Sequence, residues 1–488
     1  MPFFKRIMKR ISSIKSIMKT KIIMSLTNKY PEIDTLMKII NIMVRKYHEE
    51  CISAGIATDL DGDGLMDEME EDDRWVPYLL TLGLIYKVQK NDSKAWYNHE
   101  TSFLQNDDLQ EKFLTTFGYF WHLLVEISKC IRTQSSEDVL EQLRTTMTCI
   151  PQEDIIYAHS TDQQHLGDHC PDFALTLQRD QKLVVLTICG TRMIPAPEMK
   201  DVFMDLYADT EPFLHGHAHR GMAIGCRNIV EKVLPFILST LEENPGYEIM
   251  VTGYSLGAGI SQLVTMEFSE GESRKVIPSG TIIRCFCYGT PPVFYSDEVQ
   301  DYKCPNVYSV TFNNDGLISA SLTNVLKLFM QIKALERMHM RRRDMCRLVF
   351  SKSDFNINPL ESFRKSGGNE QEEEGDEDIQ TNADEDDDED EMGDTENELK
   401  SELWMQVREA LDKVSHGGDL IHLEHPSKLF IFKRKNDIIT RIFHDTNPFT
   451  CSLRLRASMF KDHMPWGYNT LFEGYGLSSD DVDLNCVK

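Results

Sequence analysis

The sequence lacks the features that mark a secreted or membrane-spanning protein. Its twelve cysteines are scattered, without a Cys-x-x-Cys pair or a compact framework, which favours reduced thiols inside a cell. The N-terminus has no clear secretory signal pattern. The longest uncharged apolar stretch near the front, Trp75–Tyr86, is far shorter than the roughly 20 residues of a spanning helix. We therefore expect a cytoplasmic protein with no signal peptide and no transmembrane helix.

Positive charge is absent from residues 370–398, which hold eighteen Asp or Glu and no Lys or Arg. This run accounts for most of the net charge of −26, and the rest of the chain carries only −8. The body of the protein is therefore not basic enough to predict nucleic-acid binding. The acidic run also has few apolar residues to bury, so we expect a disordered, solvated segment.

Negative charge is absent from residues 1–30, which carry eight Lys or Arg. Apolar residues recur there near helical spacing, so the segment reads as a basic amphipathic arm. It is rich in Lys, whereas organelle transit sequences are usually rich in Arg. We favour contact with an anionic membrane surface, with a transit sequence and a disordered arm as alternatives.

Residues 31–150 are expected to be a helical region, because apolar residues follow 3–4 spacing over 31–58 and 103–147. Between these stretches, an Asp-rich loop at 59–70 has Gly64 at its sixth position and oxygen-bearing side chains at the calcium-ligand positions Asp59, Asp61, Asp63, Asp67 and Glu70. That spacing wraps hard oxygen ligands around one Ca²⁺. The flanks are poor helix partners, and the alternative is a solvated acidic turn.

Residues 151–319 alternate strand-like and helix-like patterns, which predicts an α/β fold with a mainly parallel central sheet covered by helices. Residues 320–420 interrupt this alternation of strand-like and helix-like patterns. They form a long insertion with a basic helical stretch at 325–349 followed by the acidic run. Residues 421–480 resume the sheet pattern at 429–432 and complete the core.

The central motif is Gly253-Tyr254-Ser255-Leu256-Gly257, which lies between a β-prone run and a helical pattern from Ile260 to Phe268. A strand, a tight turn and a helix in that order are the context of a nucleophile elbow. The two glycines let strand and helix approach closely while the turn lifts the Ser255 hydroxyl. An ordinary strand-to-helix turn is the alternative.

A serine nucleophile needs a general base and an acid that orients the base. Asp315 fits the acid, because it follows the strand at 307–312, although Asn-Asp-Gly is also good turn chemistry. Periodicity does not choose the base among the downstream histidines His416, His422, His425, His444 and His463.

The stretch from about Pro171 to Tyr468 resembles the lipase class 3 family, the fungal-lipase-like α/β-hydrolases, and within it most resembles the sn-1-specific diacylglycerol lipases. The matching motifs are, in order, Pro171-Asp172-Phe173, Leu186-Thr187-Ile188-Cys189-Gly190-Thr191, Asp201–Tyr207, His219-Arg220-Gly221-Met222, the elbow, Tyr288-Gly289-Thr290-Pro291-Pro292, Asn314-Asp315 and Met459–Pro465. Together they are far more specific than any one alone.

The resemblance implies Ser255 as nucleophile, Asp315 as orienting acid and His463 as base. It implies an oxyanion hole from Thr191 and the backbone N–H of Leu256, and no cofactor for catalysis. Two departures stand out: Tyr254 replaces the family's usual His, and Cys189 its usual Arg.

The implied function is a serine lipase that hydrolyses acylglycerol esters at a membrane surface, with diacylglycerol as substrate. Alternatives are a phospholipase A1 or triacylglycerol lipase of the same fold, and a non-catalytic, lipase-like calcium-binding scaffold. Residues 193–213 resemble a mobile lid. The pattern His215-x-His217-x-His219 would place three imidazoles on one face of a strand, but His219 already belongs to the lipase motif, so a metal site is not favoured.

Overall fold

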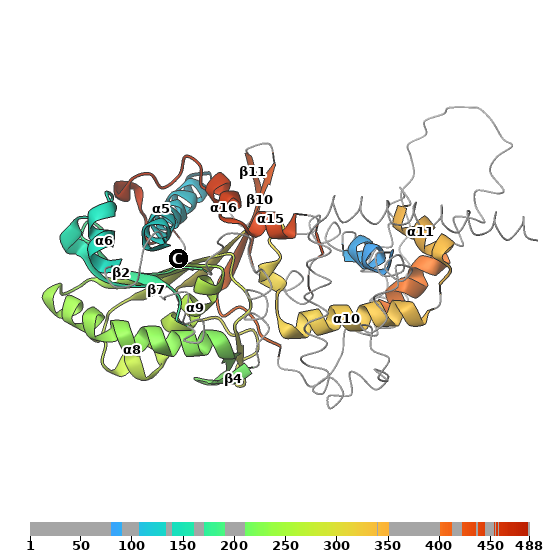
Figure 1. Ribbon diagram of the computed structural model, residues 1–488, viewed down its shortest axis with the longest axis horizontal. Coiled ribbons are helices and arrows are strands. Elements are labelled where there is room, and N and C mark those ends of the chain that lie inside the picture. Colours follow the sequence, from blue (N-terminus) through green and yellow to red (C-terminus); the bar gives the residue numbers. More distant parts are fainter. Residues whose placement is uncertain are drawn as a thin grey trace, which may run out of the picture. The chain divides into compact units, whose positions relative to one another are not determined.

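Figure 1 shows the computed structural model of the chain. The structure describes residues 80–89, 107–132, 139–160, 170–190, 210–338, 340–350, 401–411, 422–435, 438–444 and 453–486, the last range without 454 and 457. The chain divides into two compact units. The sheet unit comprises Met24–Asp59, Thr101–Leu328 and Gly418–Lys488, and the helical unit comprises Met1–Ile23, Leu60–Glu100 and Phe329–Gly417.

An eight-stranded sheet forms the centre of the sheet unit, in the order β1-β2-β3-β6-β7-β9-β10-β11. Its strands are β1 (Ile155–His159), β2 (Phe173–Gln178), β3 (Leu183–Ile188), β6 (Glu248–Tyr254), β7 (Ile283–Tyr288), β9 (Val307–Phe312), β10 (Lys428–Lys435) and β11 (Ile438–His444). The strands from β3 to β10 pair in parallel, and β1, β2 and β11 pair antiparallel at the two edges. Every residue of β3, β7 and β9 is buried, as expected for strands covered on both faces. The predicted α/β class with a mainly parallel sheet is confirmed.

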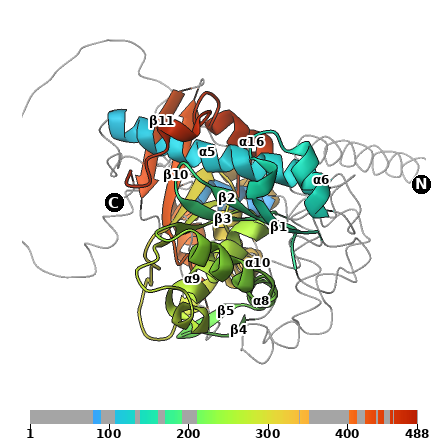
Figure 2. The same cartoon turned by 90° about the vertical axis from the view of Figure 1, so that its left-hand side faces the viewer.

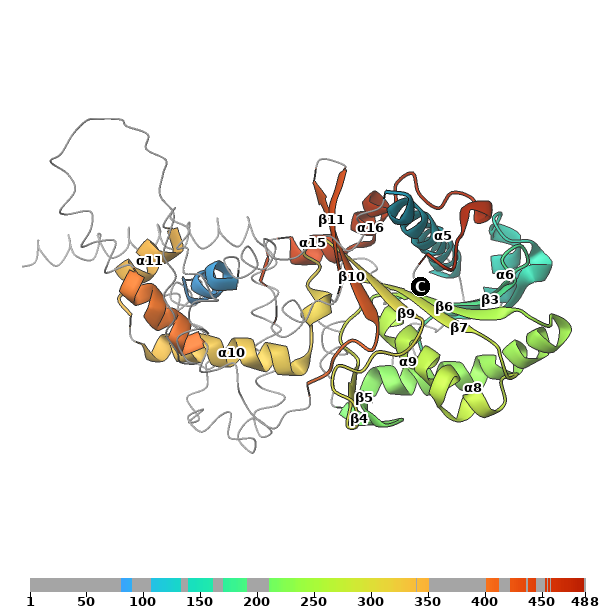
Figure 3. The same cartoon turned by 180° about the vertical axis from the view of Figure 1, so that it is seen from behind.

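Helices cover both faces of this sheet (Figures 1 and 3). One face carries α8 (Arg220–Glu243) and α9 (Leu256–Glu270). The other carries α5 (Asp107–Arg132), α6 (Val139–Thr146) and α16 (Pro465–Leu471), and Figure 2 shows α5 running across the sheet. The remaining short elements of the sheet unit are α15 (Met459–His463), η2 (Gln152–Asp154), η3 (Glu272–Lys275), η4 (Leu317–Ser319) and η5 (Ser479–Asp481).

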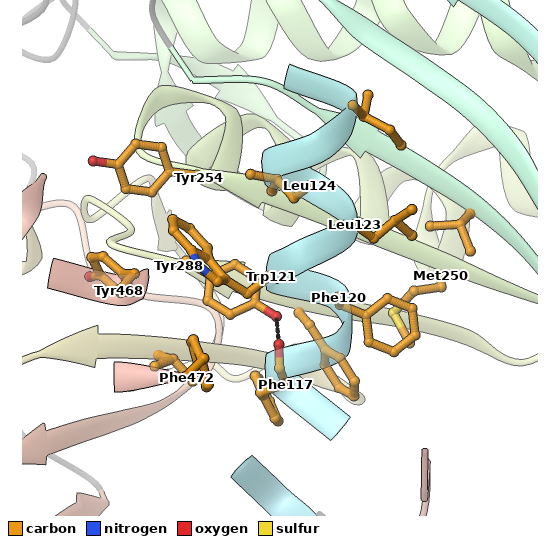
Figure 4. Packing of buried hydrophobic residues seen from close by; sticks show 14 of the residues in the cluster. Phe117, Phe120, Trp121, Leu123, Leu124, Met250, Tyr254, Tyr288, Tyr468 and Phe472 are labelled. Carbon is orange, nitrogen blue, oxygen red and sulfur yellow. Dashed lines mark hydrogen bonds between the residues drawn. The ribbon is translucent and has the colours of Figure 1, made fainter. Parts of the chain in front are cut away.

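Aromatic residues of α5 supply much of the core on their face of the sheet (Figure 4). The ring of Phe117 stacks on that of Phe286 in β7, with centroids 4.2 Å apart. The hydroxyl of Tyr288 donates to the backbone carbonyl of Phe117 at 2.5 Å. Fully burying one such side chain stabilises the fold by roughly 2–3 kcal/mol. The helix expected at 103–147 therefore belongs to the layer that covers the sheet; the domain boundary at 150 stays a prediction.

A second, three-stranded antiparallel sheet joins β4 (Thr210–Phe213), β5 (Gly216–His219) and β8 (Phe294–Ser296). It adjoins the start of α8, because His219 ends β5 and Arg220 begins the helix. No pattern in the sequence predicted this sheet. Its strands are only 3 or 4 residues long, too short for a period-2 pattern to be recognised.

The described part of the helical unit contains helices only: a segment at 80–89, the part of α10 (Leu322–Arg337) from Phe329, α11 (Arg342–Phe350) and a segment at 401–411. The ammonium group of Lys87 donates to the carbonyl of Leu348 at 2.6 Å and lies 5.8 Å from the ring centre of the buried Trp404. The helical stretch expected at 325–349 is thus two helices. Among the described helices, none is long and apolar enough to cross a membrane.

Candidate active site

The loop between β6 and α9 has a strained backbone. Ser255 has φ 59° and ψ −125°, a conformation that non-glycine residues rarely adopt. Its N–H donates to the carbonyl of Tyr288 at 3.0 Å, and its own carbonyl accepts from the N–H of Gly259 at 3.1 Å. These bonds hold the residue between a core strand and a core helix, which is how the fold keeps the strain in place.

Gly257 allows the first turn of α9 to lie directly against the end of β3. A Cβ atom at this position would stand 2.4 Å from the carbonyl oxygen of Ile188 and 2.6 Å from that of Cys189. Both contacts are with backbone atoms, which cannot swing away. The Gly-x-Ser-x-Gly spacing therefore follows from close packing at the turn as well as from its dihedral angles.

Ser255, His463 and Asp315 form one hydrogen-bonded chain. The Oγ atom of Ser255 lies 2.9 Å from Nε2 of His463, and Nδ1 of His463 lies 2.9 Å from Oδ2 of Asp315. Asp315 has no exposed surface, and Ser255 is 5% exposed. Three segments distant in sequence meet here: the β6–α9 turn, the loop after β9, and the end of α15.

Two further donors hold the Asp315 carboxylate. The N–H of Leu317 donates to Oδ1 at 2.8 Å, and the hydroxyl of Tyr468 donates to Oδ2 at 2.7 Å. Burial, together with the charge of Asp315, raises the pKa of Tyr468 well above its usual range, so this hydroxyl keeps its proton and acts as a donor. Nothing in the local sequence around Tyr468 indicated this role.

Tyr254 contacts His463 twice. Its hydroxyl donates to the backbone carbonyl of His463. Its ring is stacked on the imidazole, with centroids 5.2 Å apart and an interplanar angle of 17°. In the sequence, Tyr254 stood out only as a departure from the family pattern.

A second polar network joins the loop that carries Asp315 to the helix that carries His463. The carboxylate of Asp462 accepts from the N–H of Asn314 at 3.0 Å and from the hydroxyl of Ser458 at 2.6 Å. The ammonium group of Lys433 in β10 donates to the carbonyl of Asn313 and, at 3.0 Å, to Oδ1 of Asn314. Burial raises the pKa of Asp462, while the Ser458 and Asn314 bonds and Lys433 act in the opposite direction.

The other candidate bases occupy different surroundings or are not described. His425 is fully buried, its Nε2 lies 2.7 Å from the carbonyl oxygen of Ile318, and burial lowers its pKa to about 3. Burial also lowers the pKa of His422. His444 lies in β11, where only the backbone is described, and His416 lies outside the described residues.

The three histidines at 215, 217 and 219 have separate partners. His215 faces Glu270 at 3.8 Å, His217 faces Asp297 at 3.3 Å, and Nδ1 of His219 accepts from the N–H of Met222 at 3.3 Å. Within the described ranges, no group of His, Cys, Asp or Glu side chains is arranged to hold a metal ion.

The remaining predicted site residues are only partly described. Leu256 opens α9, so its N–H is one of the helix's first donors, which have no acceptor within the helix. Thr191, the calcium-type loop with Asp59, Asp61, Asp63, Asp67 and Glu70, the lid segment up to residue 209, the basic arm and the acidic run lie outside the described residues.

The structure has a strained strand–turn–helix with a serine at the end of a parallel strand, an acid in the loop after a later strand, and a histidine at the end of a short helix further along the chain. This arrangement is that of the α/β-hydrolase fold. Within it, residues 185–324 match the family model described as lipase (class 3). The family resemblance predicted from the motifs is thereby confirmed.

Similar proteins include human diacylglycerol lipase-alpha, 27% identical over 156 residues, and mouse diacylglycerol lipase-beta, 25% identical over 161 residues. These matches cover 29% and 31% of this chain but only 14% and 22% of the respective relatives. Among solved structures, triacylglyceride lipase of Rhizomucor miehei is 15% identical, with a TM-score of 0.30 over 45% of this chain and 75% of that one. Lipase II of Rhizopus niveus is 17% identical, with a TM-score of 0.30 over 43% and 73%.

Proposed function

We propose that the chain is a serine lipase: a carboxylic ester hydrolase that cleaves acylglycerols through an acyl-enzyme, with the sn-1 ester of diacylglycerol as its substrate. The observation that carries the proposal is the Ser255–His463–Asp315 chain, with two contacts of 2.9 Å, at a strained turn. The class 3 lipase match over residues 185–324 supports the same chemistry. The choice of diacylglycerol rests on the 27% identity to diacylglycerol lipase-alpha.

The first half-reaction forms the acyl-enzyme. Nε2 of His463 accepts the Ser255 proton as Oγ attacks the ester carbonyl carbon, and the carbonyl π electrons move to the oxygen. The N–H of Leu256, with Thr191 as the second donor, stabilises the oxyanion. The intermediate then collapses, and the leaving alcohol takes the proton from His463.

The second half-reaction releases the fatty acid. Water enters, His463 takes one of its protons, and the oxygen attacks the acyl carbon. Collapse of the second tetrahedral intermediate returns the proton to Ser255. Asp315 stays ionised throughout; it holds the imidazole in the tautomer that presents a free Nε2 and stabilises the transient imidazolium.

An activity-based probe tests the enzyme class. A fluorophosphonate should label the wild-type protein, and Ser255→Ala should abolish both labelling and ester hydrolysis. Ser261→Ala is the matched control, because Ser261 is a buried serine of α9 whose hydroxyl binds the carbonyl of Gly257. Wild-type protein that is neither labelled nor active would favour the alternative of a calcium-binding, lipase-like scaffold.

A lipid panel tests the substrate. Fatty-acid release should be fastest from the sn-1 position of diacylglycerol. Faster release from a phospholipid would reassign the protein as a phospholipase A1, and faster release from triacylglycerol as a triacylglycerol lipase. Both alternatives use the same nucleophile, so labelling of Ser255 would be unchanged.

We also propose that the basic arm at 1–30 holds the enzyme peripherally on anionic lipid, since each Lys or Arg near such a surface contributes roughly 1 kcal/mol. The acidic run at 370–398 would oppose that attraction. Deleting 1–30 should lower sedimentation with anionic vesicles. Deleting 370–398 should raise it, most clearly at low salt. Unchanged binding and turnover after the second deletion would make the acidic run a spacer.

For the loop at 59–70 we propose one Ca²⁺ held by the predicted ligands Asp59, Asp61, Asp63, Asp67 and Glu70. Calorimetry of the full chain should show saturable calcium heat that is lost in Asp59→Asn/Glu70→Gln. Equal heats from both proteins would rule this site out.

A further inference from the structure

We propose that Tyr254 is a positioning residue for His463, so that the adjacent residues Tyr254 and Ser255 fix opposite ends of the same histidine. This inference rests on the proposed function, because it concerns the proposed general base. It assigns a purpose to the residue that departs from the family's sequence pattern just before the nucleophile.

The first contact concerns the end of the helix that carries the base. α15 has only 5 residues and ends at His463, and the next residue, Met464, is extended, with φ −65° and ψ 150°. The last carbonyls of a helix have no partner within the helix. The hydroxyl of Tyr254 donates to one of them, that of His463. Such a short helix has little stability of its own, so this bond tethers the backbone that carries the imidazole.

The second contact concerns the imidazole plane. The last torsion of a histidine side chain is soft, and its preferences are broad. The Tyr254 ring lies nearly parallel to the imidazole, with an interplanar angle of 17° and centroids 5.2 Å apart, so this stacking favours one orientation of the imidazole plane. Tyr254 is itself held, because the ring of Trp121 meets its ring edge-on, with centroids 5.5 Å apart.

These contacts matter because the base must serve two partners in turn. Nε2 must face Ser255 in the first half-reaction and water in the second, while Nδ1 stays on Asp315. Misplacing a reacting group by about 1 Å costs roughly 100-fold in rate. The aromatic face beside His463 also attracts the imidazolium that forms in each transition state.

Two substitutions separate the hydroxyl from the ring. Tyr254→Phe keeps the stacking and removes the tether, and we expect kcat to fall by about 5- to 10-fold, as for the loss of one hydrogen bond. Tyr254→Leu removes both contacts, and we expect a fall of roughly 100-fold. KM should stay unchanged in both, because Tyr254 is proposed to act on the base and not on the substrate. Tyr295→Leu is the control, since Tyr295 is an exposed aromatic of β8 and its kcat should match the wild type.

A spectroscopic measurement reads the same effect without turnover. With ¹⁵N-labelled histidine, the Nδ1–H proton shared between His463 and Asp315 should be protected from exchange in the wild type, exchange faster in Tyr254→Phe, and be lost in Tyr254→Leu. Three results would overturn the proposal. They are a folded Tyr254→Leu protein whose kcat equals that of the wild type, a rise in KM with no change in kcat, and proton exchange in both variants that is as slow as in the wild type. A wild-type protein without esterase activity would refute the proposed function instead, and the exchange measurement would still test the positioning of His463.

Discussion

The hydroxyl of Tyr468 donates a hydrogen bond to Oδ2 of Asp315 at 2.7 Å, the same oxygen that lies 2.9 Å from Nδ1 of His463. Tyr468 belongs to α16, which begins two residues after His463, so one short stretch of chain supplies both partners of this oxygen. The N–H of Leu317 donates to the other oxygen of Asp315, Oδ1, so both carboxylate oxygens are held.

Tyr468→Phe should lower kcat without preventing folding. The substitution keeps the fully buried ring and removes one donor to a carboxylate, an interaction typically contributing about 1.5–3 kcal/mol. We expect roughly 10-fold slower ester hydrolysis, measured as initial rates at saturating substrate. Tyr295→Phe, at an exposed tyrosine, is the control. Full activity of Tyr468→Phe would mean that the Leu317 N–H and His463 alone suffice to orient the carboxylate.

Gly289→Ala should damage the site more than its backbone conformation alone explains. Gly289 has φ +58°, and a Cβ there would stand 3.0 Å from Oδ2 of Asp315 and 3.1 Å from Cε1 of His463. Gly246 is the matched control, because it has φ +85° and open space around a Cβ. Both alanine variants should lose about 1–2 kcal/mol of unfolding free energy through the left-handed conformation.

Only Gly289→Ala should also lose ester hydrolysis, by roughly 100-fold, because crowding displaces the acid and the base. Urea unfolding and initial rates measure the two effects separately. Equal activity in the two variants would show that the site tolerates a methyl group at position 289, beside Asp315.

Acid should destabilise the fold through His425. Burial lowers the pKa of its imidazole to about 3, with Lys303 and His422 acting in the same direction and the Ile318 carbonyl against them. In the unfolded chain the pKa returns to about 6.5, so between pH 6.5 and 3 the unfolded state binds the extra proton. Stability is therefore lost as pH falls through this window, at about 1.4 kcal/mol per pH unit.

His425→Gln should remove that component, because a glutamine amide can still donate to Ile318 but does not titrate. Between pH 7 and 5, the wild type should lose about 2 kcal/mol more unfolding free energy than the variant. Urea titrations at the two pH values provide the measurement. Parallel losses in both proteins would mean that His425 is already accessible to protons in the folded state.

The sequence predicted the elbow because a strand, a glycine-flanked serine and a helix are contiguous, so local pattern alone specified Ser255. Local sequence also predicted that Asp315 lies in a loop, because this residue follows a recognisable strand. Local sequence did not predict the base, because five downstream histidines were all candidates. Only the family resemblance favoured His463, which the structure places beside Ser255.

What could not be predicted depends on contacts between distant parts of the chain. Trp121 in α5 meets Tyr254, Tyr288 and Tyr468 from a helix more than 100 residues upstream, and no periodicity indicates such a meeting. The same contacts place α5 on its face of the sheet, and the sequence did not predict that position. The fold class followed from alternating patterns, whereas the contacts around Ser255, His463 and Asp315 depend on packing between distant segments.

Lys433→Met should weaken the link between the strand β10 and the site. Its ammonium group binds the Asn313 carbonyl and Oδ1 of Asn314, and its charge favours the ionised form of the nearby Asp462. We expect kcat to fall several-fold and the unfolding free energy to fall by about 1–2 kcal/mol at pH 7.

The deficit relative to the wild type should be pH-dependent. Burial raises the pKa of Asp462, so its carboxyl group takes up a proton more readily than a free one as the pH falls, and the protonated form needs no neighbouring cation. As pH rises toward 7 the carboxylate ionises, and the variant lacks the charge that favours this form, so the stability gap widens. Lys428→Met on the same strand is the control, because Lys428 only approaches the Tyr308 ring, 5.7 Å from its centre, a contact contributing about 0.5–1 kcal/mol. The difference in unfolding free energy between Lys428→Met and the wild type should stay constant from pH 4 to 7. A constant difference for Lys433→Met as well would show that Lys433 acts through its hydrogen bonds alone and not through the charge of Asp462.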